Sequence, residues 1–332
     1  MGCHDAVPVS VVIPCHNGER HLAATIESVI AQDAPAWELV VIDDGSTDGT
    51  AAIIDRYRQV LGERLVAEAG PNRGVSAARN RGTALARGRY LQYLDADDVL
   101  RPGSLRAKFE ALEASGDDVA YSDWQELVET TSGAFAAGRL HARRWEDVSP
   151  VAEIAAFSDF WAPPAALLYR RAIVDRIEGG FSASLPMTQD GRFLFDAVRL
   201  GARLRHVAMV GADYRIAKER RSLSQRDRAG FMRDWARYAF DVEALWRAEG
   251  ALDDARRLAL LRRFGQTTRA LYELDRPAFW RIHRHMQSLD PAFIPAMRPA
   301  LRIAARILGY PRAEALALAG RRVRRRMRAA RE

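Results

Sequence analysis

Three aspartates that follow an apolar run are the first candidates for residues that do chemistry. Tyr90–Leu94 leads directly into Asp95-Ala96-Asp97-Asp98. Such a run predicts a buried strand that would deliver Asp95 and Asp97 to the carboxyl edge of a sheet, where α/β proteins bind ligands. Because carboxylates this close together raise a pKa or recruit a cation, a hard divalent ion is expected. Mg²⁺ or Mn²⁺ would complete its coordination with water and substrate phosphates.

A simpler role for these aspartates stays open at this point. Asp side chains also cap helix N-termini, and a helix is expected to begin near Pro102 and Ser104. Since an Asp-x-Asp pair is a common pattern, the metal interpretation depends on what else the chain places beside it.

A second acidic loop follows another apolar run. Trp37–Ile42 leads into Asp43-Asp44-Gly45-Ser46-Thr47-Asp48-Gly49-Thr50, and a helix is expected next. Capping that helix needs one residue, such as Asp48 or Thr50. Asp43 and Asp44 stand before the cap and need another explanation.

The order of strand, polar turn and helix recurs four times in the first hundred residues. Val7–Ile13 is β-branched and ends in Pro14-Cys15-His16-Asn17-Gly18, and Leu65–Ala67 is a short third strand. This order predicts a mostly parallel sheet with right-handed crossovers, flanked by helices. The helix that starts after Asn72-Arg73-Gly74 opens with small and basic residues, and its Arg79 can pair with a phosphate or with the carboxylates.

The pattern between residues 115 and 224 is weaker. We expect a short strand at Asp118–Asp123, a hairpin over 124–140, and a helix with Asp190 in its first turn. An acid at that position also suits the helix dipole, so the local sequence does not decide whether Asp190 is catalytic. The segment Phe157–Pro164 is rich in aromatic residues and prolines, and is either a packed surface loop or a shelf beside an active site.

The last third of the chain has helical periodicity throughout. We expect a catalytic α/β domain over residues 1–224 and a helical accessory region over 225–332. The final helix is strongly basic, with arginines at 321, 322, 324, 325, 326, 328 and 331. Three interpretations of this basic helix stay open: it is simply solvated, it rests on anionic lipid, or it binds nucleic acid.

Composition narrows the class of protein. Of 332 residues 48% are apolar, which excludes wholesale disorder, and the net charge of +7 suggests anionic partners. The two cysteines, Cys3 and Cys15, lack metal-ligand spacing and indicate a reduced, cytoplasmic protein. We see no targeting signal at the N-terminus and no run of eighteen apolar residues, so no membrane span is expected.

Several of these loops, taken together and in this order, match one known pattern. The matching segments are residues 11–18, 41–48, Asn72-Arg73-Gly74 with Ala78-Arg79-Asn80, Leu94-Asp95-Ala96-Asp97-Asp98, and Gln189-Asp190. Together they resemble the family 2 glycosyltransferases of the GT-A fold over residues 8 to about 224. The resemblance implies a Rossmann-like catalytic domain with a C-terminal helical appendage.

The resemblance also implies roles for individual side chains. A nucleotide-sugar donor would contact six of them: Pro14 and His16 at the base, Asp44 at a pyrimidine ring, Asn72 and Arg79 along the nucleotide, and Asp95 at the ribose and metal shell. Asp97, with Asp95, would hold the Mn²⁺ or Mg²⁺ that bridges the diphosphate. Asp190 takes the position of the general base.

The resulting expectation is an inverting, metal-dependent glycosyltransferase that uses a nucleotide-diphosphate sugar, with UDP-sugars favoured. Its acceptor would be a glycan or lipid-linked hydroxyl in surface polysaccharide or glycolipid synthesis. It would work in the cytoplasm, at the inner face of an anionic membrane through its Arg-rich helix, without nucleic acid.

Two departures from the family pattern motivate alternatives. Gln189 stands where the family usually has Glu, and the His often found after Tyr214-Arg215 is missing, with Lys218 as a substitute. A non-catalytic nucleotide-sugar-binding or scaffolding protein of the same fold is one alternative. A polyanion binder that acts through the Arg tail is the other.

Overall fold

The computed structural model describes residues 8–34, 36–217 and 226–329. The chain forms two compact units, Met1–Ser222 and Leu223–Glu332, and each is described by itself. The expected boundary between residues 224 and 225 falls within 218–225, outside the described residues.

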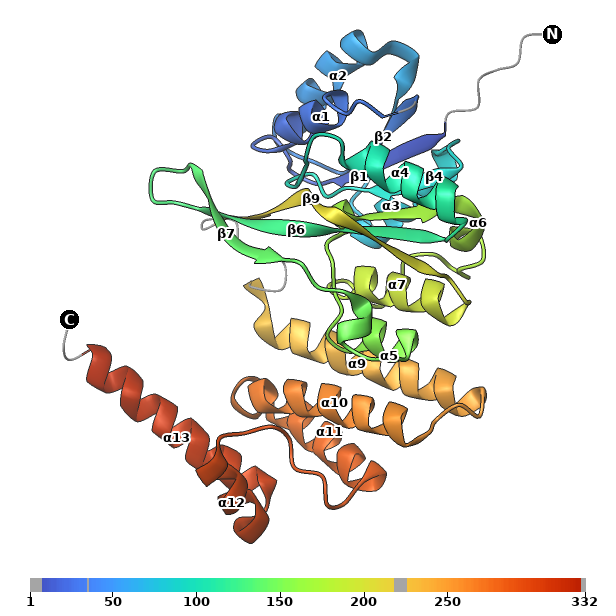
Figure 1. The fold of residues 1–332 in the computed structure, drawn as a ribbon. Helices are drawn as coiled ribbons and strands as arrows, with labels where there is room; N and C mark the ends of the chain where they lie inside the picture. The colour runs from blue at the N-terminus through green and yellow to red at the C-terminus, as the bar shows by residue number, and fades with distance from the viewer. Residues whose placement is uncertain (1–7, 35, 218–225, 330–332) are drawn as a thin grey trace. The chain divides into compact units, whose positions relative to one another are not determined.

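The first unit is built on one mixed sheet (Figure 1). Its described strands are β1 (Val9–Cys15), β2 (Trp37–Asp44), β3 (Leu65–Gly70), β4 (Tyr90–Tyr93), β5 (Val99–Leu100), β6 (Val119–Glu129), β7 (Phe135–His141), β8 (Leu167–Arg170) and β9 (Leu204–Ile216). The order is β3-β2-β1-β4-β8-β6-β9-β5, and β7 pairs with β6. Strands β1 to β4 are parallel, as the strand-helix order predicts, and β8 adds an antiparallel strand beside β4.

Helices cover this sheet because its central strands are apolar on both faces. In β1, Val9, Val11, Val12 and Ile13 are fully buried. The described helices of this unit are α1 (Leu22–Ile30), α2 (Thr50–Leu61), α3 (Val75–Leu85), α4 (Ser104–Ser115), α5 (Ala152–Phe157), α6 (Arg171–Val174) and α7 (Gln189–Arg199). Figure 1 shows α1 and α2 on one side of the sheet and α5 and α7 on the other.

Strand β6 differs from its expected form. The short strand and the first arm of the hairpin are one continuous strand, and the hairpin with β7 is confirmed. The pairing of β6 with β9 is irregular: Ser122 lies opposite Val207 and Trp124 opposite Ala212, so β9 advances five residues where β6 advances two. Bulges of this kind re-aim the side chains that come after them.

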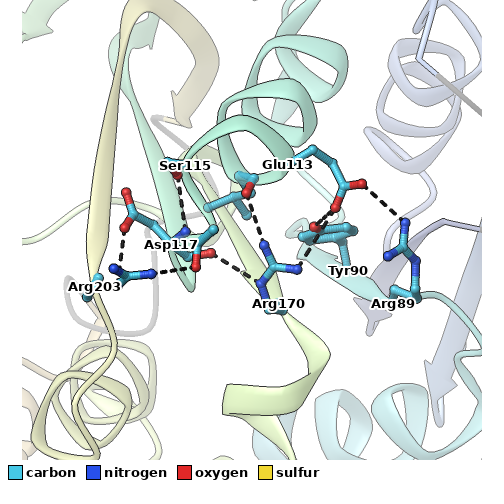
Figure 2. Close-up of polar contacts among 9 residues, drawn as sticks. Arg89, Tyr90, Glu113, Ser115, Asp117, Arg170 and Arg203 are labelled. Atoms are coloured by element: carbon cyan, nitrogen blue, oxygen red, sulfur yellow. Dashed lines mark hydrogen bonds and ion pairs between the residues drawn. The ribbon is translucent and has the colours of Figure 1, made fainter.

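The edge of the sheet where β4, β6 and β9 begin carries a dense polar network (Figure 2). Glu113 accepts hydrogen bonds from the Tyr90 hydroxyl and from Arg89. Arg170 donates to the Leu112 and Asp117 carbonyls. We call this set the amino-edge network; its members are Arg89, Tyr90, Glu113, Asp117, Arg170, Arg203 and Arg205, the last two paired with the Asp117 carboxylate.

The second unit is helical, as expected. Its described helices are α9 (Arg228–Ala248), α10 (Asp254–Leu274), α11 (Arg276–Leu289), α12 (Pro299–Leu308) and α13 (Tyr310–Ala329). Asp227, Asp253 and Asp275 accept backbone N–H bonds at the starts of the first three, which satisfies donors that a helix leaves free. Trp246, Phe264 and Phe279 are fully buried in its core. Among the described residues, we find no helix with the length and apolar character needed to cross a bilayer.

Candidate active site

Three loops meet where β1, β2 and β3 end. His16 lies with its Nδ1 2.9 Å from the Asp44 carbonyl oxygen, and the Asn72 side-chain amide is 3.2 Å from the same ring nitrogen. Asn17 adopts a left-handed backbone conformation (φ 54°), and its side-chain oxygen accepts the Thr47 N–H. The structure therefore brings His16, Asp44 and Asn72 together, while Pro14 is buried within β1 just before them.

Asp44 fixes the loop that opens α3. Its two carboxylate oxygens accept the N–H groups of Arg73 (2.7 Å) and Gly74 (2.8 Å). Gly74 has a positive φ of 90°, which disfavours side chains with a Cβ. Each carboxylate oxygen keeps a further lone pair, so Asp44 can accept from a ligand while it holds the loop.

Arg79 is a deeply buried charged group of the site, with 2% of its surface exposed. Its Nη2 lies 2.5 Å from Asp95 Oδ1, and in the described structure its Nε and Nη1 have no hydrogen-bond partner. Burial lowers the pKa of Arg79, but the charges of Asp95 and Asp190 outweigh burial and the pKa is raised. A permanently charged guanidinium with unused donors is suited to binding an anionic or polar ligand.

The Asp95 loop is tied to β9 by its last residue. Asp98 is buried and accepts the Arg215 N–H at 2.9 Å, and Arg215 donates back to the Asp97 carbonyl at 3.3 Å. Burial, with the charges of Asp97 and Asp95, raises the pKa of Asp98 well above its ordinary value. The next helix along the chain has Gly103 at its N-cap, so capping does not explain these aspartates.

The donor set at this loop fits a cation shared with a substrate. Asp97 is exposed and Asp95 is half-buried. Among the described residues no group of three His, Cys, Asp or Glu side chains forms a closed metal site. Mg²⁺ and Mn²⁺ in nucleotide enzymes often use one or two carboxylates, with phosphate and water completing the shell. Two carboxylates at an open edge match that chemistry.

Asp190 lies in the first turn of α7, as expected. One oxygen accepts the Gly191 N–H at 2.8 Å and the other accepts the Trp161 indole N–H at 3.0 Å. Burial raises the pKa of Asp190, although Arg79, Trp161 and Gly191 oppose the shift. Gln189 is buried, and its side-chain oxygen accepts the Asp190 N–H at 3.0 Å. A carboxylate of raised basicity in this position is suited to taking a proton.

An aromatic cluster stands beside Asp190. The Trp161 ring meets Trp124 and Tyr214 edge to face, with centroids 5.4 and 5.7 Å away. Burial raises the pKa of Tyr214, and the charges of Asp98, Asp95, Asp97 and Asp190 raise it further. In the segment Phe157–Pro164, Phe157, Phe160 and Pro164 are buried, and Trp161 contacts Asp190. The aromatic signal in that segment was visible in the sequence, but its contact with Asp190 was not.

Comparisons with known proteins show the family of this chain. The family profile described as Glycosyl transferase family 2 matches residues 10–132. TuaG of Bacillus subtilis, named as a teichuronic acid biosynthesis glycosyltransferase, is 36% identical over 191 residues, which cover 58% of this chain and 67% of TuaG. The chain belongs to glycosyltransferase family 2. It spans about half the length of several other curated relatives of this glycosyltransferase.

Solved structures confirm the expected fold. Residues 1–349 of S. aureus TarS, in complex with UDP-GlcNAc, match with a TM-score of 0.67 at 20% identity, covering 94% of this glycosyltransferase and 92% of that chain. The mannosyltransferase PcManGT of Pyrobaculum calidifontis, in complex with GDP-Man and Mn²⁺, matches with a TM-score of 0.56 at 18% identity, covering 93% and 86%. Lys218, expected to replace a missing His, lies outside the described residues.

Proposed function

We propose that this glycosyltransferase moves a sugar from a nucleoside-diphosphate donor, with UDP-sugars favoured, to an acceptor hydroxyl, with inversion at the anomeric carbon. The observation that carries the proposal is the position of Arg79. The buried Arg79 guanidinium is ion-paired with Asp95, and the charge of Asp190 also acts on it. The carboxylate expected at the metal and the carboxylate expected to act as the base therefore lie around the same side chain.

The proposed donor site uses the residues of three loops. His16, Asp44 and Asn72 form its nucleotide end, with Pro14 beneath them in β1. Asp97 and Asp95 would hold Mg²⁺ or Mn²⁺, which when bound neutralises charge on the diphosphate oxygens. The unused Arg79 nitrogens would donate to oxygens of the donor.

The transfer step depends on the position of Asp190. The acceptor hydroxyl oxygen attacks the anomeric carbon, and its proton goes to the Asp190 carboxylate. The bond from the anomeric carbon to the diphosphate oxygen breaks, and its electron pair leaves with the nucleoside diphosphate. Arg79, and Arg215 beside the Asp97 backbone, supply fixed positive charge near that leaving group.

The donor is tested by thermal stability, because a ligand that binds only the native state raises the melting temperature. UDP-, GDP-, dTDP- and CMP-sugars are each added with and without Mn²⁺, to the wild type and to Asp97→Ala. A metal-dependent shift with one nucleotide, lost in Asp97→Ala, supports the proposal. A shift without turnover of any acceptor would favour the non-catalytic binder, and no shift with any donor would overturn the donor site.

The acceptor class is proposed from the relatives. TuaG is named for teichuronic acid biosynthesis. We propose a surface polysaccharide or its lipid-linked precursor as the acceptor here. Transfer of radiolabelled sugar into lipid extracts and into isolated polysaccharide separates the two forms.

We also propose that the second unit rests on an anionic bilayer. Helix α12 exposes Ile303, Ile307 and Leu308, with Ile307 at 75% exposure, and the exposed Arg302 and Arg306 lie beside them on the helix. Between residues 291 and 331 the sequence holds one acidic residue, Glu314, and that side chain is buried. An apolar face bordered by arginines complements anionic lipid, whereas a second copy would bring like charges together.

The arginines of the last helix add to this proposal only in part. Arg321 is half-buried and Arg322 exposed. The side chains of Arg324, Arg325, Arg326, Arg328 and Arg331 lie outside the described part of the chain. Co-sedimentation with phosphatidylglycerol vesicles should exceed that with phosphatidylcholine and should fall in Ile307→Asp. Equal binding to both vesicles, or concentration-dependent self-association abolished by the same substitution, would contradict the bilayer assignment.

A further inference from the structure

We infer that Trp161 is a positioning residue that holds the Asp190 carboxylate in the orientation needed to take the acceptor proton. This inference rests on the base role proposed for Asp190. It assigns a function to a side chain that the loop motifs do not include.

The hydrogen bonds to Asp190 come from two elements. The Gly191 N–H, on α7 itself, donates to Oδ1 at 2.8 Å, and the Trp161 indole donates to Oδ2 at 3.0 Å. A carboxylate held at both oxygens cannot rotate about its terminal bond without losing a bond. Each oxygen keeps a free lone pair, so the group stays able to accept a proton.

The indole is held in place by its own neighbours. Trp124 and Tyr214 contact it edge to face, and Trp124 is itself stacked on His141 with ring centroids 3.7 Å apart. Trp161 is 36% exposed, so part of its ring reaches the surface while its N–H donates to Asp190. Edge-to-face aromatic contacts favour one ring orientation over others.

The loop behind Trp161 is anchored from the core. The Pro164 carbonyl accepts from Gln92 at 2.9 Å, and the Ala165 carbonyl accepts from Lys108 at 3.0 Å. Gln92 and Lys108 are both fully buried, and they are joined to each other at 2.5 Å. The loop therefore meets α7 on a fixed support, which is what a positioning residue requires.

Other charged and titratable groups also act on Asp190. Arg79 comes from α3, Asp95 from the loop after β4, Tyr169 from β8 and Tyr214 from β9. Arg79 stabilises the ionised carboxylate through its charge, while its own ion pair is with Asp95. Trp161 adds a directional bond, so its loss should change both the orientation and the basicity of Asp190.

Trp161→Phe isolates the contribution of the indole N–H, because it keeps an aromatic ring and removes that donor. With the donor identified by the thermal shift, release of UDP with water as acceptor gives kcat and KM without a known acceptor. We expect kcat to fall about tenfold with the donor KM unchanged, and the acid limb of the pH profile to move about one unit toward higher pH. Trp280→Phe, an exposed tryptophan on α11, is the control and should behave like the wild type.

A second measurement does not depend on turnover. In protein labelled with ¹⁵N-tryptophan, the indole signal that disappears in Trp161→Phe should shift in Asp190→Ala, while the Trp280 signal stays in place. A Trp161→Phe enzyme with wild-type kcat and pH profile, or an indole signal indifferent to Asp190→Ala, would overturn the inference. If instead Asp190→Asn retains full activity, the proposed base role fails, whatever the indole signal shows.

Discussion

The two ends of the strands use the same residue types for opposite purposes. In the amino-edge network, Glu113 accepts from Tyr90 and Arg89, and Asp117 pairs with Arg203 and Arg205. At the carboxyl edge four carboxylates, Asp95, Asp97, Asp98 and Asp190, gather near two guanidinium groups, Arg79 and Arg215.

The difference lies in how completely the charges are satisfied. Within the described structure, Asp98 Oδ2 and two Arg79 nitrogens are buried without a hydrogen-bond partner, and both residues belong to the carboxyl edge. Unsatisfied buried polar atoms cost about 1–3 kcal/mol each. Perturbed and incompletely paired charges make the carboxyl edge a candidate site, whereas the paired charges of the amino-edge network stabilise the fold.

The largest effect is expected from Asp190→Asn, which removes the base and keeps the shape. Sugar transfer should fall by about 10²- to 10⁴-fold, while the donor-induced thermal shift persists. The matched change at the other edge, Glu113→Gln, should leave transfer unchanged. Initial rates at saturating donor measure both variants, and a similar loss in Glu113→Gln would mean that the two edges are not functionally distinct.

An intermediate effect is expected from Arg79→Gln and its counterpart Arg170→Gln. Losing a charged, buried donor should weaken UDP binding about 10- to 100-fold, because such hydrogen bonds contribute about 1.5–3 kcal/mol. Arg170 donates to backbone carbonyls far from the loops of the site. Its substitution should lower the melting temperature and spare UDP affinity in titration calorimetry. Weaker UDP binding in Arg170→Gln would contradict the contrast.

The last effect concerns the stability of the fold and depends on Lys108, which supports the Trp161 loop. Burial lowers the pKa of Lys108 to about 7, and its two acceptors, Gln92 and Ala165, satisfy a neutral amine. An unfolded lysine titrates near 10.4. Between about pH 7 and 10 the unfolded chain binds more protons, so this group makes stability rise with pH, by up to about 1.4 kcal/mol per unit.

Denaturant unfolding at pH 7, 8 and 9 measures that slope. Lys108→Met should flatten it, since the titrating group is gone, and below pH 7 both states are protonated and the contribution stays constant. An identical slope in Lys108→Met would show that the lysine is charged in the folded protein.

The acidic loops of the carboxyl edge were visible in the sequence because each acidic cluster comes directly after an apolar strand. A parallel strand delivers the residues after its last position to a known edge of the sheet, so the Asp95 and Asp43 loops could be assigned together from sequence. The pairing of Asp190 with Trp161 could not, because 29 residues separate them and nothing local records their contact.

The amino-edge network was equally invisible. Its arginines are scattered along the chain, with Arg89 just before β4, Arg170 in β8, and Arg203 and Arg205 around the start of β9. Isolated arginines give no pattern in a chain with 50 Lys and Arg residues. The continuous β6 was missed for a related reason. Its second half pairs with β7 in the hairpin and with β9. These pairings continue the strand beyond Asp123, where the sequence pattern predicted its end.

The register slip between β6 and β9 has an evolutionary consequence. Strand β9 gains residues on β6 between Ser122 and Trp124, so its second half has its own register on β6; that second half also pairs with β5 and bonds to the Asp97–Asp98 loop through Arg215. Because Arg215 in this second half bonds to Asp98 and to the Asp97 carbonyl, a change in its length would move Asp97, whereas Asp44 is held by the loop before α3. The Asp95–Asp98 loop and the second half of β9 therefore have to change together during evolution, whereas the Asp44 loop is free of that constraint.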